Sequence, residues 1–491
     1  MAKNWLAFDI GTTGAKAALV DSMGHVLRSV TREYPTHTAA GGVMEQDASD
    51  WWAAVCSASH ALDAQNSVDA IALTGQMQDV ILVTAAGDPV RPVMLYSDTR
   101  AHAEAEQVTE RLGADRIREL TGNNQDAGSL LAKLAWLQAH EPASIEASTW
   151  LLLGAADFIA HKMTGIATTD TTTASTTGLM NLAARKALDE TVFTVLGIGD
   201  STRLLPPITP GGQHVGELTG HAAKALDLQP GIPVHHGPGD AGATTIGAGS
   251  GEIGTAYAYL GTSGWIAFTA AERARPGQGV ITLAHPAPGR YIQVAPLLTA
   301  GGNLEWVRDL FGSDNYDDLI SDALECTPSR LLYLPYLNGE RSPFSDPHAR
   351  GAFVGLQATM SRNDLYRAVL EGVAYAYRHA LDALAPEATT TLTFTGGGTR
   401  SRLWCQLFSD IICLPIAIQA DAENVGVRGA ILAAQVASAE RAIFAAQEFS
   451  PIEVILQPDP TSAQHFDQLY QVFRDTYPAL KVIFERLAST P

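Results

Sequence analysis

The chain has 491 residues, more than a single hydrophobic core usually supports, and this length predicts two domains. Hydrophobic residues make up 46% and charged residues 17%, a balance typical of globular proteins rather than disordered or fibrous ones. The formal charge of −20 repels a phosphate backbone and argues against nucleic-acid binding.

The N-terminal segment predicts a β-hairpin. Residues 5–10 form an apolar run that enters the turn Gly11-Thr-Thr-Gly14, and residues 15–20 leave it as a second strand. Strands are also expected over 25–34 and 70–74, with a helix over 49–62 between them. This alternation indicates an α/β domain.

A similar hairpin is expected near the middle of the chain. Residues 256–269 predict a strand, the turn Gly261-Thr-Ser-Gly264 and a second strand, and residues 260–264 align with 10–14 without a gap. The repeat indicates two related domains, with a chance match of a short turn as the alternative. The glycine-rich stretch 247–253 predicts their boundary, which gives domains 1–247 and 248–491.

Both hairpin turns are candidate phosphate sites. Neither continues into the Gly-Lys-Ser/Thr of a P-loop, which excludes that class. A Gly/Thr turn nevertheless directs successive N–H groups into one concavity, and its hydroxyls add neutral donors. Asp9 precedes the first turn and is a candidate Mg²⁺ ligand through water, with Lys16 nearby, whereas the second copy has Tyr259. Plain structural turns are the alternative.

Residues 237–242, Gly-Pro-Gly-Asp-Ala-Gly, lie between an expected strand over 232–236 and an expected helix. They fit a dinucleotide fingerprint, but no carboxylate follows about 20 residues later, where one would hold the ribose. Asp240 is therefore either a helix N-cap or a proton acceptor. His235 and His236 are adjacent on the strand and point to opposite faces, so both are expected to be structural.

A triple-glycine turn follows later in the chain. Residues 395–401, Thr-Gly-Gly-Gly-Thr-Arg-Ser, separate an expected strand over 391–394 from an expected helix over 403–411. Such a turn permits close backbone approach to an adenine ring or a phosphate. An unliganded tight turn is the alternative.

Together these residues resemble the FGGY family of carbohydrate kinases over nearly the whole chain. The most specific match is 351–356, Gly-Ala-Phe-Val-Gly-Leu, followed after seven residues by 364–371, which satisfies the family's C-terminal signature at every specified position. The N-terminal signature is weaker, since Leu130 stands where a small hydroxyl residue or proline is usual, although Lys133 and Trp136 are in place. Further matching segments are 9–14, 75–77, Asp98 with Arg100, 169–170, 239–240, 261–264, 334–343 and 396–398.

The resemblance implies two actin-like, ribonuclease H-like α/β domains around a central interdomain cleft. It also implies that ATP, with Mg²⁺, phosphorylates a hydroxyl of a small neutral ketose or polyol, with Asp240 as the catalytic base and Asp9 on the Mg²⁺ side. The implied ATP contacts are Gly11, Thr12, Thr13, Lys16, Gly261, Thr262, Ser263, Gly302, Gly397 and Gly398. The implied substrate contacts are Gln76, Met77, Gln78, Asp79, Asp98 and Asp240.

The overall spacing is most similar to the family's xylulose kinases, which makes D-xylulose the first choice of substrate. However, Gln78-Asp79 replaces the usual His-Gly, Ala241 replaces Asn and Tyr96 replaces Trp. A carboxylate at Asp79 suits a vicinal diol and repels anionic gluconate, unless it points away from the pocket. Ribulose, fuculose, erythritol, glycerol and gluconate are the alternatives within the family.

Two alternatives come from other classes of protein, an actin-like ATPase and a catalytically inactive sugar-binding regulator. The C-terminal signature and Asp240 argue against the first, and the presence of both Asp9 and Asp240 argues against the second. Four cysteines without C-x-x-C spacing, together with the absence of an apolar leader or a membrane-length apolar run, predict a cytoplasmic protein. The expected partners are ATP and the sugar, with a homodimer as one expected assembly.

Overall fold

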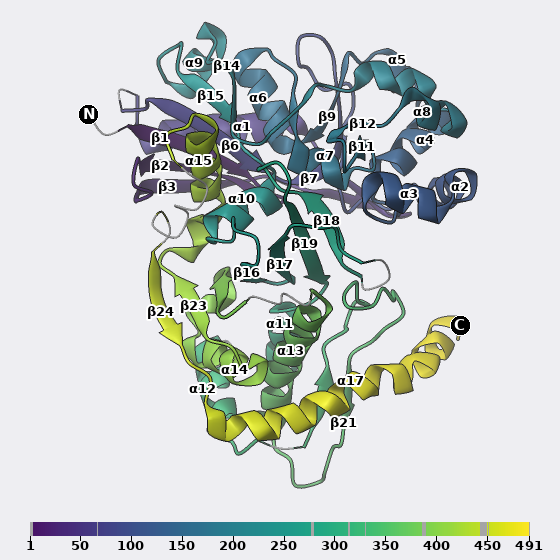
Figure 1. Ribbon diagram of the computed structural model, residues 1–491, viewed down its shortest axis with the longest axis vertical. Coiled ribbons are helices and arrows are strands. Elements are labelled where there is room, and N and C mark those ends of the chain that lie inside the picture. The colour runs from purple at the N-terminus through teal and green to yellow at the C-terminus, as the bar shows by residue number, and fades with distance from the viewer. Residues whose placement is uncertain are drawn as a thin grey trace. The chain divides into compact units, whose positions relative to one another are not determined.

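The computed structural model describes residues 3–65, 67–275, 279–312, 315–328, 330–384, 389–441, 449 and 451–490 (Figure 1). The chain forms two compact units. Unit 1 comprises Met1–Gly247, Thr282–Ile292 and Asn424–Ser450, and unit 2 comprises Ala248–Ile281, Gln293–Glu423 and Pro451–Pro491. The chain first leaves unit 1 after Gly247, but two later segments return to it. The units therefore differ from two continuous domains over 1–247 and 248–491.

A six-stranded sheet forms the centre of unit 1, with the strand order β14-β15-β6-β1-β2-β3. β1 is antiparallel to β2 and parallel to β6, and every residue of β6 is buried, as expected for a central strand covered on both faces. The strands are β1 (Asn4–Ile10), β2 (Gly14–Asp21), β3 (Val26–Glu33), β6 (Ala70–Gly75), β14 (Gln213–Glu217) and β15 (Pro233–His236).

The second large sheet, which lies mainly in unit 2, has seven strands in the order β18-β19-β17-β16-β22-β23-β24. Here β16 is antiparallel to β17 and parallel to β22, just as β1 is to β2 and β6. This equivalence confirms the expected internal repeat of two hairpin-led domains. The strands are β16 (Ala256–Leu260), β17 (Gly264–Ala270), β18 (Ile281–Ala284), β19 (Tyr291–Leu297), β22 (Leu392–Thr395), β23 (Ile416–Gln419) and β24 (Ile452–Leu456).

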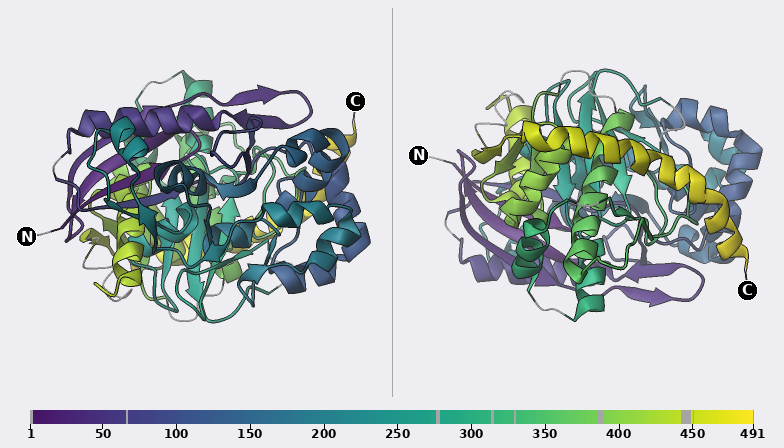
Figure 2. Two further views of the ribbon diagram at one scale, coloured as in Figure 1. Left: turned by 90° about the horizontal axis from the view of Figure 1, so that it is seen from above. Right: turned by 90° about the horizontal axis from the view of Figure 1, so that it is seen from below.

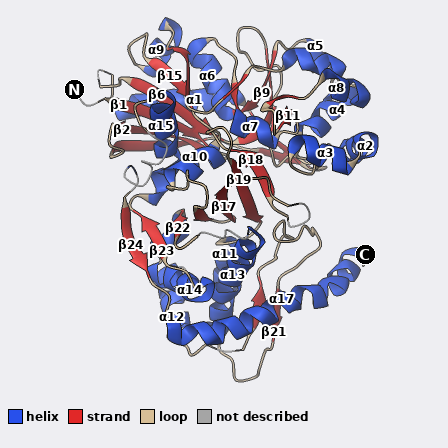
Figure 3. Cartoon of the chain, viewed as in Figure 1, coloured by secondary structure: helices blue, strands red, loops and turns tan. Residues whose placement is uncertain are grey.

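Helices flank both sheets (Figure 3). Those of unit 1 are α1 (Ala48–Leu62), α2 (His102–Leu112), α3 (Ala114–Thr121), α4 (Leu130–His140), α5 (Pro142–Glu146), α6 (Ala155–Thr164), α7 (Thr171–Thr176), α8 (Glu190–Leu196), α9 (Gly220–Leu226), α10 (Asp240–Gly247) and α15 (Val425–Ala437). Those of unit 2 are α11 (Gly302–Phe311), α12 (Tyr316–Glu325), α13 (Arg362–Leu384), α14 (Arg402–Ile412) and α17 (Pro460–Ser489). Figure 2 shows α17 as one long yellow helix that runs past α13 and α14, which it contacts.

A second, smaller sheet in unit 1 has the order β4-β5-β8-β7-β9. Its strands are β4 (His37–Ala39), β5 (Val43–Gln46), β7 (Met77–Val83), β8 (Val93–Met94) and β9 (Trp150–Gly154). Two-stranded pairs complete the topology: β10 (Thr169–Asp170) with β13 (Ile208–Thr209), β11 (Met180–Asn181) with β12 (Lys186–Ala187), and β20 (Leu332–Leu334) with β21 (Ala352–Val354).

Helix α15 explains why unit 1 includes a late segment of the chain. Its side chains from Ala430 to Ala434 pack in one apolar cluster with residues of β1, β2, β6 and α10, among them Trp5, Val20 and Ile246. A β-carbon on Gly429 would overlap the backbone of Ala243, so glycine is needed where α10 and α15 approach.

Each strand or helix end expected from the sequence differs from the observed end by at most one residue. In the part of the chain that the structure describes, no helix combines the length and the apolar character needed to cross a membrane.

Candidate active site

Asp240 is the first residue of α10 and follows the glycine-rich loop after β15. Its Oδ1 accepts a hydrogen bond from the N–H of Ala241 at 2.6 Å, and its side chain remains accessible to solvent. Surrounding protein atoms nevertheless reduce its hydration, and with repulsion from Asp9 and then Asp170 this raises the pKa of Asp240 to about 7. Such a carboxyl group accepts a proton readily at neutral pH.

The loop that carries Asp240 is held against β6. Thr74 donates its hydroxyl to the carbonyl oxygen of Pro238 at 2.7 Å, and the N–H of Gly237 donates to the carbonyl oxygen of Leu73 at 2.8 Å. A β-carbon on Gly237 would overlap that carbonyl oxygen, so the close approach of loop and strand requires glycine. Asp240 is thus carried on backbone that the central sheet fixes.

Asp9 lies near the end of β1, directly opposite Lys16 on β2. Partial burial raises the pKa of Asp9, and attraction to Lys16 opposes this rise. Its carboxylate accepts no hydrogen bond from any residue that the structure describes, and a β-carbon on Gly426 would lie only 2.5 Å from its Oδ2. A carboxylate with open oxygens beside a bare backbone fits Mg²⁺ held through water.

The turn between β1 and β2 is fixed at its backbone and open at its tip. The carbonyl oxygen of Thr12 accepts a hydrogen bond from Nε2 of Gln46 at 2.7 Å, and Tyr34 donates its hydroxyl to the carbonyl oxygen of Gly11. The side chain of Thr13 is exposed. The first predicted phosphate turn is therefore a hairpin with a fixed backbone and an exposed hydroxyl at Thr13.

Unit 2 brings the predicted nucleotide residues of its own hairpin together. The N–H groups of Ala300 and Gly302 both donate to the carbonyl oxygen of Thr262, at 2.8 and 2.9 Å. Thr262 and Ser263 are exposed, and Gly301 donates to the carbonyl oxygen of Gly261 at 2.8 Å. The N-terminus of α11 thus lies against the turn, as a phosphate site requires.

The triple-glycine turn lies against the same hairpin. A β-carbon on Gly398 would overlap the side chain of Leu260, and one on Gly396 would lie 2.7 Å from the Leu260 carbonyl oxygen. A β-carbon on Gly397, in contrast, would meet nothing within 4 Å. Gly397 therefore presents open backbone, which leaves room for the flat face of a ligand such as adenine.

The sequence predicts substrate contacts at the start of β7. There, hydrogen bonds to neighbouring segments hold the side chains. Gln76 is buried and donates from Nε2 to Oε1 of Gln46 at 3.1 Å, while its Oε1 has no hydrogen-bond partner among the described residues. Gln78 donates to the carbonyl oxygen of Gly128 at 3.1 Å and has a φ of +66°, a left-handed conformation that is rare for glutamine. Met77 is half-buried between them.

Asp79 and Asp98 are completely buried. Asp79 accepts a hydrogen bond from the N–H of Tyr96 at 3.0 Å through Oδ1, and burial raises its pKa well above the ordinary value despite the attraction of Lys133. Asp98 accepts from the N–H of Met44 at 2.8 Å and forms an ion pair with Arg100 at 2.7 Å. The sequence predicts direct substrate contacts for both residues. Their burial and their partners instead favour a role in holding neighbouring segments of the site in place.

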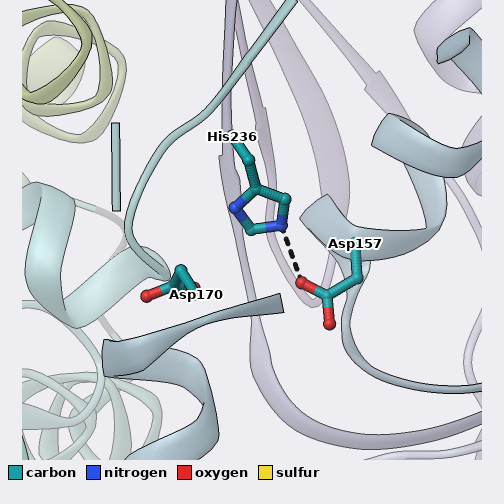
Figure 4. Close-up of side chains that lie close together, drawn as sticks. All are labelled: Asp157, Asp170 and His236. Atoms are coloured by element: carbon teal, nitrogen blue, oxygen red, sulfur yellow. Dashed lines mark hydrogen bonds and ion pairs between the residues drawn. The ribbon is translucent and has the colours of Figure 1, made fainter. Parts of the chain in front are cut away.

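Sequence reasoning missed a buried group behind the loop that carries Asp240, formed by Asp157, Asp170 and His236 (Figure 4). His236 Nε2 lies 2.7 Å from Oδ1 of Asp157. The sequence separation of 79 residues hides this pair, and no local spacing could have indicated it. His235 points the other way, with its Nδ1 at 3.1 Å from the carbonyl oxygen of Gly212.

Comparison with known proteins agrees with these features. Residues 4–247 match the N-terminal domain model of the FGGY family of carbohydrate kinases, and residues 256–438 match its C-terminal domain model. A xylulose kinase of Klebsiella pneumoniae is 31% identical, over 97% of this chain and 99% of its own length.

Solved structures show the same relationship. A structure described as a xyloylose kinase from Brucella ovis has 29% identity and a TM-score of 0.89, and the match covers 98% of this chain and 100% of the other. The xylulose kinase from Rhodospirillum rubrum has 28% identity, the same TM-score and the same coverage. The fold is therefore the expected one, with two actin-like, ribonuclease H-like α/β domains.

Proposed function

The chain belongs to the FGGY family of carbohydrate kinases, and we propose that it transfers the γ-phosphoryl group of ATP to D-xylulose, giving D-xylulose 5-phosphate. The observation that carries this proposal is Asp240, an accessible carboxylate with a pKa of about 7 at the start of α10. Similarity to xylulose kinases over nearly the full length supports the choice of sugar.

In the proposed reaction Asp240 takes the proton of the sugar hydroxyl. The sugar oxygen forms a bond to the γ-phosphorus, the bond from that phosphorus to the β,γ-bridging oxygen breaks, and ADP leaves. Phosphoryl transfer depends mainly on positioning and on neutralisation of charge, so one well-placed base is the main catalytic group that the protein must supply. The loop fixed on β6 supplies that placement.

Carbohydrate kinases of this family use ATP and Mg²⁺. The ion neutralises negative charge on the phosphates. We assign Asp9 to hold it through water, because the Asp9 carboxylate is the one beside the phosphate turn with open oxygens. The hydroxyls of Thr12, Thr13, Thr262 and Ser263, with Lys16, would hold the phosphates. Gly11, Gly261 and Gly302 would let the phosphates approach the backbone closely, and Gly397 with Gly398 would hold the adenosine.

For the sugar we assign Gln76, Met77 and Gln78 as contacts, together with Asp240. Gln76 has a buried amide oxygen without a partner among the described residues, which a sugar hydroxyl would satisfy. Because burial raises the pKa of Asp79, its charge does not account for selection against gluconate. The substrate preference must come from the shape and the neutral donors of the pocket.

An ADP-release assay with Mg²⁺ and ATP tests the proposal across ketopentoses, ketohexoses, tetritols, pentitols, glycerol and gluconate. D-xylulose is expected to give the highest kcat/KM, and the Asp240→Asn variant to release sugar-dependent ADP about 10²–10⁴-fold more slowly. ADP release that is equal with and without every sugar would contradict the kinase assignment. A different best sugar would contradict only the choice of substrate.

We also propose that the protein works in the cytoplasm, where ATP is available and thiols stay reduced. All four cysteines are free thiols. A homodimer is part of this proposal, and sedimentation velocity measures it directly.

A further inference from the structure

Both ring nitrogens of His236 lie within hydrogen-bonding distance of oxygen acceptors. Nδ1 is 2.8 Å from the carbonyl oxygen of Gly237, and Nε2 is 2.7 Å from Oδ1 of Asp157. A carbonyl oxygen can only accept, so Nδ1 carries a proton. With Asp157 Oδ1 as the second acceptor, Nε2 carries a proton too, and this arrangement makes the buried ring an imidazolium.

The two carboxylates of the group have partners at every oxygen. Asp157 Oδ2 accepts from the N–H of Leu153 at 2.8 Å. Asp170 caps α7, since its Oδ1 accepts from the N–H groups of Thr172 and Thr173 and its Oδ2 from the Thr173 hydroxyl. Although the three side chains lie within metal-binding distance of one another, neither nitrogen of His236 has a lone pair left for an ion. The buried network is therefore the hydrogen-bonded pair of His236 and Asp157 with the Asp170 carboxylate close by (Figure 4).

This network lies directly behind the loop that carries the base. His236 and Gly237 are adjacent, and Gly237 begins the turn that ends at Asp240. On the other side, a β-carbon on Gly239 would lie only 2.6 Å from the hydroxyl oxygen of Thr173, which Asp170 holds. One end of the loop thus meets His236 itself, and the other end meets a hydroxyl that Asp170 holds.

We propose that the buried imidazolium of His236 is a positioning residue for Asp240, which fixes the base loop through the Gly237 carbonyl and balances the charge of Asp157 and Asp170. The inference rests on the proposed role of Asp240. The ring acts through the loop and touches no substrate. Its positive charge also faces Asp170, a carboxylate that interacts with Asp240.

The titratable groups that interact with Asp240 and His236 come from several elements. Asp9 on β1, Asp79 on β7 and Asp170 at the start of α7 interact with Asp240, while Asp157 and Asp170 interact with His236. The acidic partners raise the pKa of His236 to about 9 even though the ring is buried. The ring therefore stays charged through the working range of a base with a pKa of about 7.

The first test is a nitrogen-resolved NMR spectrum of the histidine rings in the full-length protein at pH 7.5, with His236 assigned by its absence from the His236→Gln variant. Both ring nitrogens of His236 are expected to carry protons. A ring with one unprotonated nitrogen would overturn the imidazolium assignment. This readout requires no substrate, so it stands even if Asp240 is not the base.

The second test is the pH profile of kcat for His236→Gln, whose amide keeps a donor for Asp157 but loses the charge and the Gly237 contact. We expect plateau kcat per folded enzyme to fall by about 10- to 100-fold, because a small misplacement of a catalytic group costs this much. Loss of the positive charge should also move the acid limb of the profile to higher pH. A purely structural role would reduce the folded fraction and leave the limb in place.

His235→Gln is the matched control, since His235 is buried on the same strand and faces away from the network. It should keep the kcat and the pH profile of the parent. In the double variant His236→Gln with Asp157→Asn, one positive and one negative charge are removed together. The acid limb of the double variant should return toward the parent position. If His236→Gln alone changes neither the plateau kcat nor the position of the acid limb, the proposal is overturned.

Discussion

A β-carbon on Gly239 would overlap Sδ of Met77, so the first residue of β7 and the residue before Asp240 are in direct contact. This contact links the strand expected to bind the sugar to the loop that carries the base. Any side chain at position 239 must displace either Met77 or the loop that carries Asp240.

Gly239→Ala should therefore reduce kcat by about 100-fold, because the added methyl group moves Asp240 relative to the sugar. Steady-state kinetics of the folded variant measure this loss. Gly220→Ala is the matched control, since a β-carbon there meets nothing within 4 Å. Equal kcat in the two variants would show that the contact does not position the base.

Asp240→Asn should lower kcat by about 10²–10⁴-fold, the usual contribution of a positioned general base. The amide keeps the size of the side chain but cannot take the proton. ATP affinity, measured by calorimetry, should change little because Asp240 is not assigned to the nucleotide. A kcat within threefold of the parent would rule out the role of base.

The value of kcat should change with pH in a single transition that follows the ionisation of Asp240. Because only the ionised carboxylate accepts a proton, kcat should rise as the pH increases through about 7 and then level off. Fixed-time assays between about pH 5.5 and about pH 8.5 would give the midpoint, because this range covers about 1.5 pH units on either side of the pKa. A profile that is flat over this range would contradict the raised pKa.

The same shift predicts a cost in stability. The pKa of Asp240 is raised in the folded protein, so its contribution to the free energy of unfolding is present below the ordinary value of 3.8 and is lost as the pH rises through about 7. Asn does not titrate, and Asp240→Asn should gain stability relative to the parent between pH 5 and pH 8. Thermal unfolding at the two pH values measures this gain. Asp115→Asn, at a side chain that is 97% exposed, is the control and should show no such trend.

Asp79→Asn tests whether the charge of Asp79 selects the sugar. The side chain is completely buried and its raised pKa favours the neutral acid, so the ranking of sugars by kcat/KM should stay that of the parent. A rise of more than about tenfold for gluconate relative to D-xylulose would instead show that charge at this position sets specificity.

The sequence predicted those features of the fold and the site that depend on local pattern. The hairpin turns at Gly11–Gly14 and Gly261–Gly264, the Asp240 loop and the triple-glycine turn all occur as expected, because glycine and flanking apolar runs determine such turns locally. The strand ends follow the same apolar runs. These elements needed no knowledge of distant residues.

Other features depend on contacts that no local pattern reveals. The orientation of Asp79 depends on an irregularity in the pairing of β7 with β9 between Met77 and Ile81, where Gln78 takes its left-handed conformation. Simple alternation would have placed Met77 and Asp79 on one face. Likewise, the pairing of His236 with Asp157 exists only once β15 and α6 have packed.

The return of α15 to unit 1 has a consequence for biosynthesis. Trp5 and Val20 are synthesised long before the helix that covers them, because α15 comes far later in the sequence. Until that helix is made, one face of the first sheet exposes apolar side chains in a nascent chain prone to aggregation. We expect a chaperone to hold this intermediate during translation, and a fragment that ends at Gly247 to be insoluble when expressed alone.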